Sequence, residues 1–145
     1  MAKNIPIIAF ASNAEDMQAW KERLPQTEPL ENCGATLVFV GSVRGTYKEQ
    51  SVLYLDYEAY ETMAIRQMQE IQRQVALNWE GASVSIVHRI GRVYPMEDSV
   101  YISVSTPRRA SCYEASRFAL EELKKSVVIW KKEVYEQGDT WKANQ

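Results

Sequence analysis

The sequence predicts an α+β protein with a mostly antiparallel mixed sheet, two main helices and a short N-terminal helix. Two observations predict this class. Two long segments carry apolar residues at helical spacing, and several β-rich runs follow one another directly instead of alternating strictly with helices. A chain of 145 residues with 46% hydrophobic residues can bury a core without disulfides, so we expect one domain spanning residues 1–145.

The N-terminal part predicts a strand followed by a helix. Residues 5–10 form a short apolar run, and the proline near its start suits an edge strand. The next segment offers Ser12 or Asn13 as a helix N-cap, followed by two acidic residues in the first turn. We expect this helix to end before Pro25 and residues 26–34 to form a loop.

The central part predicts two strands and the first main helix. Residues 35–43 are rich in β-formers, and we expect them to be buried on both faces at their centre. Residues 51–60 alternate with period two, as a half-buried strand does. Residues 61–78 predict an amphipathic helix that ends near Gly81. Its apolar stripe consists of Ile65, Met68, Ile71 and Val75, flanked by Met63, Ala64 and Ala76.

Two further strands follow, separated by a turn. Residues 83–90 alternate in polarity, and residues 100–106 form another β-rich run. The residues between them, 91–99, include glycine, proline and aspartate and predict a turn. One face of the first of these strands is expected to carry Val84, Ile86, His88 and Ile90.

The C-terminal part predicts the second main helix and a last strand. Thr106 and Pro107 form an N-cap and a first-position proline, and helical spacing continues to about Ser126. The β-branched run that begins at Val127 predicts a strand to about Tyr135.

Composition excludes several classes of protein. The net charge of −2 provides no general attraction for nucleic acid. The N-terminus has no convincing signal-peptide pattern, and no run of about 18 apolar residues predicts a membrane span. Two cysteines suit a reducing cytoplasm, and with a single histidine most zinc patterns fail, so we expect no metal.

Two arginines occupy an unusual place at the start of the second main helix. Arg108 and Arg109 fall in the expected first turn, where the positive end of the helix dipole disfavours cations. An anion bound by the free backbone N–H groups and both guanidinium groups would explain this placement. Alternatively, both side chains extend into solvent and pair with Glu114 or another surface carboxylate.

Arg44 is another candidate cation. It ends an apolar strand and enters a glycine-containing loop, where functional groups are common. Gly41 just before it indicates a bulge or a close approach of the backbone. A plain surface arginine is the alternative.

The change from helical to strand periodicity predicts where each lysine side chain between residues 124 and 132 points. Lys124 lies four residues after Leu120 and flanks the apolar stripe, whereas Lys125 lies about 100° further round and faces solvent. On the following strand, Lys131 points opposite to Lys132. We therefore expect Lys124 and Lys131 to converge on one pocket, with Lys124 partly desolvated. Alternatively, Lys124 and Lys125 are both solvated lysines that are favoured by the negative C-terminal end of the helix dipole.

Two other reactive residue types are expected to be structural. His88 lies on an apolar strand face, which is typical of a hydrogen-bonded core histidine. Cys112 lies near a helix start beside arginines, where a thiol pKa can be lowered. No second histidine accompanies it, so a small buried residue is the favoured interpretation over a reactive thiol.

Five segments together resemble the large, catalytic subunit of molybdopterin synthase: "FVGSVR", "LDYEAYETMA", "VHRIGRVYP", "STPRRASCYEASRFALEELKKSVVIWKKE" and "GDTW". They occur in the family's order over about residues 35–141. The resemblance implies an α/β-hammerhead-like fold and a sulfurtransferase of molybdenum cofactor biosynthesis. Such an enzyme converts cyclic pyranopterin monophosphate, a pterin phosphate, into molybdopterin by adding two sulfurs as a dithiolene.

The resemblance also implies partners. A small ubiquitin-like sulfur-carrier subunit brings each sulfur as a thiocarboxylate on its C-terminal Gly-Gly tail. Two large subunits form a homodimer within a heterotetramer, with one small subunit at each end. Neither a cofactor of its own, nucleic acid nor a membrane is implied, and the expected location is cytoplasmic.

Family site positions fall on specific residues of this chain. The catalytic lysines correspond to Lys124 and Lys131. The substrate-binding positions correspond to Ser42, Val43, Arg44, Arg108, Arg109, Lys132 and Glu133. Of these, Ser42, Val43 and Glu133 rest on the resemblance alone.

The chain departs from the family pattern at three places. Arg108 stands where the family usually has histidine, which replaces a titratable group by a permanent charge. Gly45 stands where an asparagine is usual. Some relatives supply a basic residue from the tail of the neighbouring protomer, and we expect it to be absent here, with Gln145 near that place.

Two alternative functions stay open from the sequence. A non-catalytic phospholigand-binding or scaffold domain could keep the fold and the partner groove. Single-stranded nucleic-acid binding through tyrosines and lysine pairs is disfavoured by the charge of −2.

Overall fold

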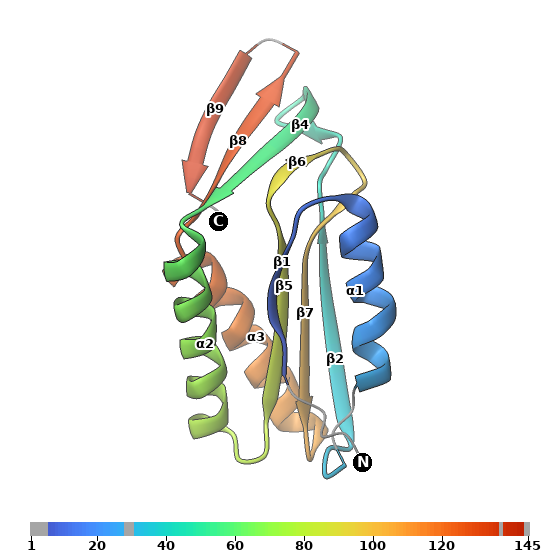
Figure 1. The fold of residues 1–145 in the computed structure, drawn as a ribbon, viewed down its shortest axis with the longest axis vertical. Coiled ribbons are helices and arrows are strands. Elements are labelled where there is room, and N and C mark those ends of the chain that lie inside the picture. Colours follow the sequence, from blue (N-terminus) through green and yellow to red (C-terminus); the bar gives the residue numbers. More distant parts are fainter. Residues whose placement is uncertain (1–5, 28–30, 137, 144–145) are drawn as a thin grey trace.

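The computed structural model describes residues 6–27, 31–136 and 138–143 (Figure 1). The helices are α1 (Ala14–Thr27), α2 (Glu61–Asn78) and α3 (Arg109–Ser126). The strands are β1 (Ile8–Ala11), β2 (Ala35–Ser42), β3 (Thr46–Tyr47), β4 (Gln50–Ala59), β5 (Ser83–Arg89), β6 (Gly91–Val93), β7 (Asp98–Thr106), β8 (Ile129–Tyr135) and β9 (Gly138–Ala143). The predicted α+β class is confirmed, while the predicted strand start at residue 5, part of the predicted loop and Gln145 lie outside the described residues.

The first sheet contains the long strands in the order β1-β5-β7-β2 and has helices on both faces. β1 runs parallel to β5, whereas the other two pairs are antiparallel. α1 packs on one face, where Met17 and Leu24 meet Val87 and Tyr101, and α2 and α3 cover the other face (Figure 1). The expected edge position of the first strand is confirmed.

The second sheet has the order β3-β4-β8-β9, with β6 also paired to β4, and lies beyond one end of the first sheet (Figure 1). β3 and β4 form a hairpin whose turn residues, Lys48 and Glu49, have φ values of 50° and 65°. This left-handed pair is the geometry that two-residue hairpin loops prefer. The arrangement places Tyr47 at the edge of the junction between the two sheets, where it lines a cavity.

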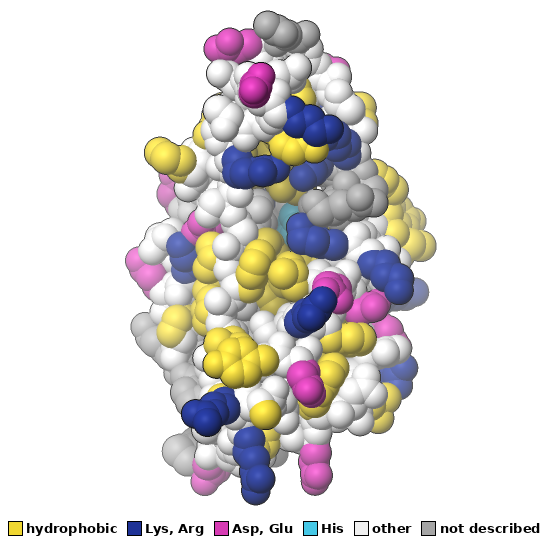
Figure 2. Space-filling model, turned by 180° about the vertical axis from the view of Figure 1, so that it is seen from behind, with side chains coloured by type: hydrophobic (Ala, Val, Ile, Leu, Met, Phe, Trp, Pro, Cys, Tyr) yellow, Lys and Arg dark blue, Asp and Glu magenta, His cyan; other side chains and the backbone are white. Residues whose placement is uncertain are grey.

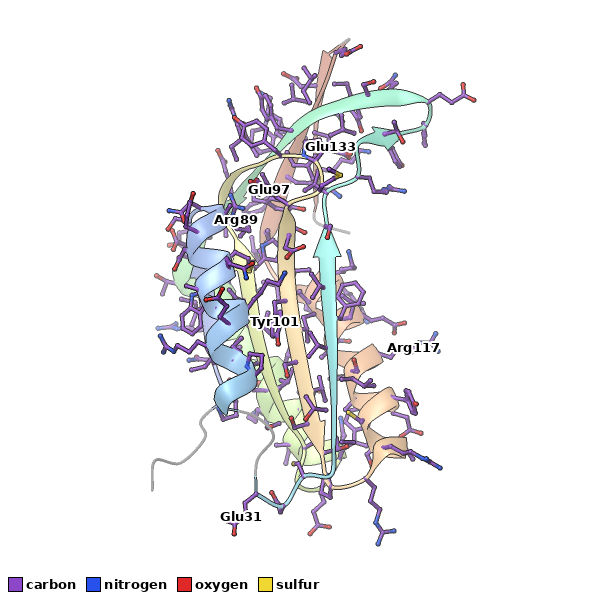
Figure 3. All side chains as sticks on the ribbon, turned by 90° about the vertical axis from the view of Figure 1, so that its right-hand side faces the viewer. Glu31, Arg89, Glu97, Tyr101, Arg117 and Glu133 are labelled. Atoms are coloured by element: carbon purple, nitrogen blue, oxygen red, sulfur yellow. The ribbon has the colours of Figure 1, made fainter. Side chains whose placement is uncertain are left out.

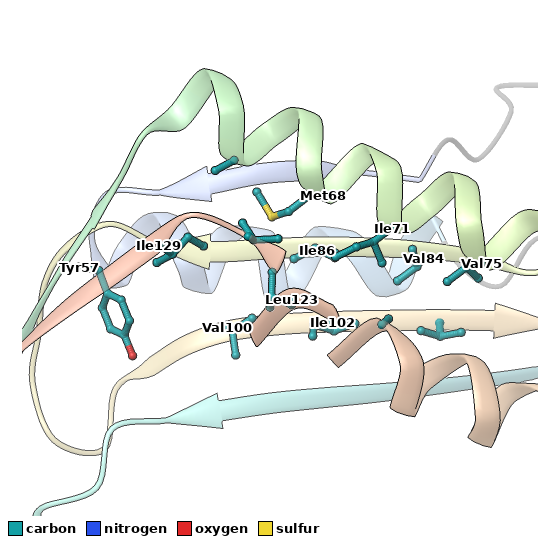
Figure 4. Close-up of a cluster of buried hydrophobic side chains, with 14 of the residues drawn as sticks. Tyr57, Met68, Ile71, Val75, Val84, Ile86, Val100, Ile102, Leu123 and Ile129 are labelled. Carbon is teal, nitrogen blue, oxygen red and sulfur yellow. The ribbon is translucent and has the colours of Figure 1, made fainter. Parts of the chain in front are cut away.

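The main core lies between α2, α3 and the first sheet. Met68 and Ile71 of α2 and Leu123 of α3 project into the same layer of buried side chains (Figure 4). The stripe predicted on α2 is confirmed at Met68, Ile71 and Val75, although Ala64 is fully buried and Ile65 only partly so. Helical spacing alone therefore located the buried face to within one residue.

Two predictions about the N-terminal half were wrong. α1 continues through Pro25 to Thr27, because a proline in the last turn removes a hydrogen bond only near the helix end. The strand predicted at residues 35–43 is not buried on both faces, since Val38 and Phe39 are 47% and 36% exposed. The reason is that β2 is an edge strand, and only strands inside a sheet between two helix layers are covered throughout.

Two further predictions, in the C-terminal half, need correction, and one strand was not predicted. The predicted turn at residues 91–99 contains β6, which pairs with β4 through only three residues. The N-cap of α3 is Arg108, not Thr106, whose hydroxyl instead donates to the Arg108 carbonyl oxygen at 2.5 Å. Thr106 is still part of β7, opposite Ala35, so the helix starts two residues later than its sequence signal. β9 was not predicted, because its short polar sequence has no clear alternation.

Two negative findings apply to the described part of the chain. There, no helix combines the length and the apolar character needed to cross a membrane. Nor do three or more His, Cys, Asp or Glu side chains within those residues lie together as metal ligands would.

Candidate functional site

A cavity of about 260 Å³ opens where the second sheet meets the ends of β2 and β7 and the last turn of α3. Figure 2 shows that Lys and Arg side chains gather over this part of the molecule. Six of the nine site residues expected from the sequence line the cavity: Ser42, Val43, Arg44, Lys124, Lys131 and Glu133. The predicted convergence of Lys124 and Lys131 on one pocket is confirmed.

The two lysines meet because the backbone changes from helix to strand between them. Lys124 lies in the last turn of α3, next to the buried Leu123. Val127 is extended and ends the helix, and Lys131 then lies on the same face of β8 as the buried Ile129. The inward face of the strand therefore brings its lysine to the cavity at the end of the helix.

The pocket lowers the pKa of both lysines. Desolvation against the cavity wall lowers the pKa of Lys124, although the residue as a whole stays exposed, as does Lys125. Desolvation also lowers the pKa of Lys131; the charges of Lys124, Lys142 and Arg44 act in the same direction, and only Glu133 opposes them. Within the described residues, neither Lys124 nor Lys131 forms an ion pair. Both ammonium groups are thus cations that lack a partner carboxylate there.

Glu133 is the buried carboxylate of the site, only 6% exposed. Lys142 Nζ lies 2.6 Å from its Oε1, and the Tyr135 hydroxyl donates to its Oε2 at 2.7 Å. Burial alone would raise the pKa of Glu133, but these two hydrogen bonds and the charge of Lys131 lower it. Glu133 is therefore ionised and held in one orientation, in the second sheet beyond the ends of β5 and β7 (Figure 3).

The segment that carries Arg44 is held by a bulge at the end of β2. The register shifts between Gly41 and Ser42, and a Cβ on Gly41 would lie 2.8 Å from Val100 Cγ1, so the predicted close approach is confirmed. The Arg44 guanidinium lies over the ring of Tyr47, 5.1 Å from its centroid. This contact holds the Arg44 guanidinium at the cavity, in agreement with its choice as a candidate site residue.

Three expected site residues lie outside this cavity. Arg108 and Arg109 are exposed at the start of α3, about 22 Å along the helix axis from Lys124 at 1.5 Å per residue. Lys132 faces the outer side of β8, 3.3 Å from Asp139 and over the ring of Trp141. The structure therefore does not unite these residues with Lys131 in one protomer.

His88 and Cys112 are structural, as predicted. His88 is 1% exposed, and its Nδ1 lies 2.8 Å from the Arg89 carbonyl oxygen. Burial lowers its pKa to about 4, with smaller contributions from the charges of Lys124 and Lys131, so it is neutral at pH 7. Cys112 is 1% exposed and its thiol donates to a backbone carbonyl, while Cys33 is also a free thiol.

Sequence reasoning missed several residues around the cavity. Tyr57 lines it and is the register partner of Lys131 on β4, which the period-two pattern of that strand could have indicated. Tyr47 lies in a strand of two residues, and Lys142 comes from β9, so neither carried a usable signal. Tyr135 was assigned to the last strand without a role.

The chain is similar to proteins of one family. A family model described as MoaE protein matches residues 11–126. A molybdopterin synthase catalytic subunit from Halalkalibacterium halodurans is 46% identical over 114 residues, which cover 79% of this chain and 73% of that protein. A protein of the same name from Bacillus subtilis is 43% identical over 112 residues, with 77% and 71% coverage.

A solved structure supports the same relationship at the level of the fold. The crystal structure of molybdopterin synthase from Staphylococcus aureus superimposes with a TM-score of 0.83 and 35% sequence identity. The match covers 98% of both chains.

Proposed function

This chain belongs to the MoaE protein family, and we propose that it is the catalytic subunit of molybdopterin synthase, an enzyme of molybdenum cofactor biosynthesis. The observation that carries the proposal is the convergence of Lys124, Lys131 and Arg44 on one cavity beside the buried Glu133. A cavity with three cations and one engaged carboxylate suits an anionic substrate. We further propose that residues 1–145 act as one domain and that the protein is cytoplasmic.

The proposed reaction is sulfur transfer to a pterin phosphate. A small ubiquitin-like subunit inserts its C-terminal Gly-Gly thiocarboxylate into the cavity. The sulfur bonds to a carbon of cyclic pyranopterin monophosphate as an oxygen substituent leaves that carbon. Water then hydrolyses the resulting thioester, so the sulfur stays on the pterin and the carrier terminus leaves as a carboxylate. Two such transfers give the dithiolene of molybdopterin.

Lys131 and Lys124 have the central roles in this proposal. Both hold the thiocarboxylate and stabilise negative charge while sulfur adds to the substrate. The lowered pKa of Lys124 also suits a proton shuttle, because a lysine that loses its proton more easily can act as a base. Arg44, with Ser42 and Val43 beside it, binds the phosphate and the polar edge of the pterin.

Arg108, Arg109 and Lys132 act on a different surface of the same protomer. Because about 22 Å of helix separates Arg109 from Lys124, we propose that the arginines reach substrate in the cavity of a second protomer. The exposed apolar side chains of the edge strand β2, Val38, Phe39 and Val40, fit an interface between two large subunits. The proposed assembly is a homodimer with one small subunit at each end, that is, a heterotetramer.

Incubation with a thiocarboxylated small subunit and the pterin precursor tests the function. A catalytic subunit forms the dithiolene product, detected by mass spectrometry or by its fluorescent oxidation products. A scaffold or phospholigand-binding domain, the alternative function, would form the complex without product.

Mixed dimers test the contribution of the second protomer. If Arg109 serves the other protomer's cavity, K131A and R109A are each inactive as homodimers but recover part of the activity when mixed. Mixed dimers as inactive as the parents would contradict this arrangement. The K131A/R109A double variant mixed with the wild type is the control, because each cavity of that mixed dimer lacks one of the two residues and should be inactive if Arg109 acts across the dimer.

A further inference from the structure

Lys142 and Lys131 form a directly opposed pair of like charges. They are register partners on β9 and β8, so both side chains stand on the cavity side of the second sheet. Like charges directly opposite in a sheet are destabilising. Two partners of Lys142 offset its repulsion with Lys131. They are the Glu133 carboxylate at 2.6 Å and the ring of Tyr47, whose centroid is 4.6 Å from Nζ.

Glu133 is the carboxylate for which these lysines compete. It lies two residues after Lys131 on the same face of β8, where a short movement of either side chain would pair them. In the structure both of its oxygens have strong partners, Lys142 at Oε1 and the Tyr135 hydroxyl at Oε2. The Lys142 bond ties one oxygen to β9 and the Tyr135 bond holds the other within β8, and Glu133 forms no ion pair with Lys131.

The groups that face Lys131 from the surrounding elements include a single carboxylate among the described residues. They are Glu133 on its own strand, Lys142 on β9, Tyr57 on β4, Lys124 on α3, Arg44 after β2 and His88 on β5. The orientation of Glu133 therefore decides whether the Lys131 ammonium is neutralised within the protein or left to bind another anion.

We propose that Lys142 is a positioning residue of this site: it holds the Glu133 carboxylate on the β9 side and so leaves the Lys131 ammonium free for an anionic group in the cavity. The inference rests on the proposed function, which makes Lys131 the residue that meets the anions. Lys142 acts through Glu133 and need not touch substrate.

The titration of Lys131 in the free protein tests this role directly. NMR of isotope-labelled lysine side chains follows Lys131 in the wild type, K142A, E133Q, K142A/E133Q and K142R. The charge of Lys142 itself lowers the pKa of Lys131, so the change from E133Q to K142A/E133Q measures this direct effect. If Glu133 also turns to Lys131, the rise from the wild type to K142A should exceed that change by roughly 0.5 unit. K142R should titrate like the wild type.

A matched control separates the bond to Glu133 from the general charge of the cavity. Lys48 also lies over the ring of Tyr47, 5.4 Å from the centroid, but forms no ion pair with Glu133. K48A should leave the Lys131 titration unchanged. A rise in K142A no larger than the change from E133Q to K142A/E133Q would overturn the proposal.

Kinetics gives a second readout. K142A is expected to lower kcat roughly 5-fold with KM for the pterin precursor little changed, because a Lys131 paired with Glu133 stabilises less of the developing charge, and K142R should restore it. Equal kcat in K142A and the wild type would also count against the proposal. The NMR titration needs no turnover, so a wild type that forms no dithiolene would refute the proposed function while leaving the role of Lys142 decided by the titration.

Discussion

Lys131 and Tyr57 are direct partners across β8 and β4, and the ring of Tyr57 meets His88 edge-on with centroids 5.0 Å apart. The half-buried Lys131 is thus separated from the buried His88 by a single aromatic ring, that of Tyr57. Adding a proton to His88 would place a charge inside the core and beneath the lysines of the cavity. The neutral state of His88 is therefore part of what allows two lysines to converge at this place.

His88 should make the protein lose stability in mild acid. Its pKa is about 4 in the folded protein against an ordinary value of 6.5, so the unfolded chain binds the proton first. The unfolding free energy should fall as pH drops from 6.5 to 4, by up to about 3 kcal/mol from this group. Urea unfolding of the wild type and H88N across this range measures the difference, in which other groups cancel. A difference that does not change with pH would contradict the assignment.

Replacing Lys131 should remove catalysis without removing the complex. K131A takes away the ammonium that meets the thiocarboxylate, and we expect product formation to fall at least about 100-fold. Binding of the small subunit, measured by calorimetry, should change little. K125A is the matched control, since Lys125 is the exposed neighbour of Lys124 on α3 and has no proposed role in the site. Unchanged turnover in K131A would disprove the role of Lys131.

The sequence identified the lysine pair but not the whole cavity, for a physical reason. Lys124 and Lys131 follow from local periods, because the helix and the strand each determine where a side chain points. The burial of β2 depends on its edge position, which no local pattern encodes. Lys142 and Tyr47 reach the site only through pairing between strands distant in sequence, and Lys142 lies on a strand too short and polar to be recognised.

Removing the charge of Lys131 should stabilise the fold while it destroys the site. Desolvation lowers the pKa of Lys131, so its charged form is less favourable in the folded protein than in the unfolded chain. K131M should raise the unfolding free energy by about 0.5–1 kcal/mol at pH 7.

The pH dependence of K131M supplies the check. The unfolded chain binds the Lys131 proton up to the ordinary pKa of 10.5, whereas the folded protein releases it earlier. Wild-type stability should therefore gain from this group as pH rises toward 10.5, and K131M should lack that gain. Denaturant titrations at neutral and alkaline pH measure the unfolding free energies of the wild type and K131M. If the two free energies change with pH in parallel, the prediction is wrong.

Among residues 41–45, which carry Arg44 to the cavity, Gly41 should be the position most sensitive to substitution. Its missing side chain leaves room for Val100, because a Cβ there would lie 2.8 Å from Val100 Cγ1. G41A must displace the Val100 side chain or move β2 away from β7, which should cost about 1–3 kcal/mol of stability and shift Arg44, three residues further on. We expect a lower melting temperature and a raised KM for the pterin precursor. Gly45 is the matched control, since its Cβ would meet nothing closer than Pro95 at 4.0 Å. Equal effects of G41A and G45A would mean that the close approach to Val100 does not position the site.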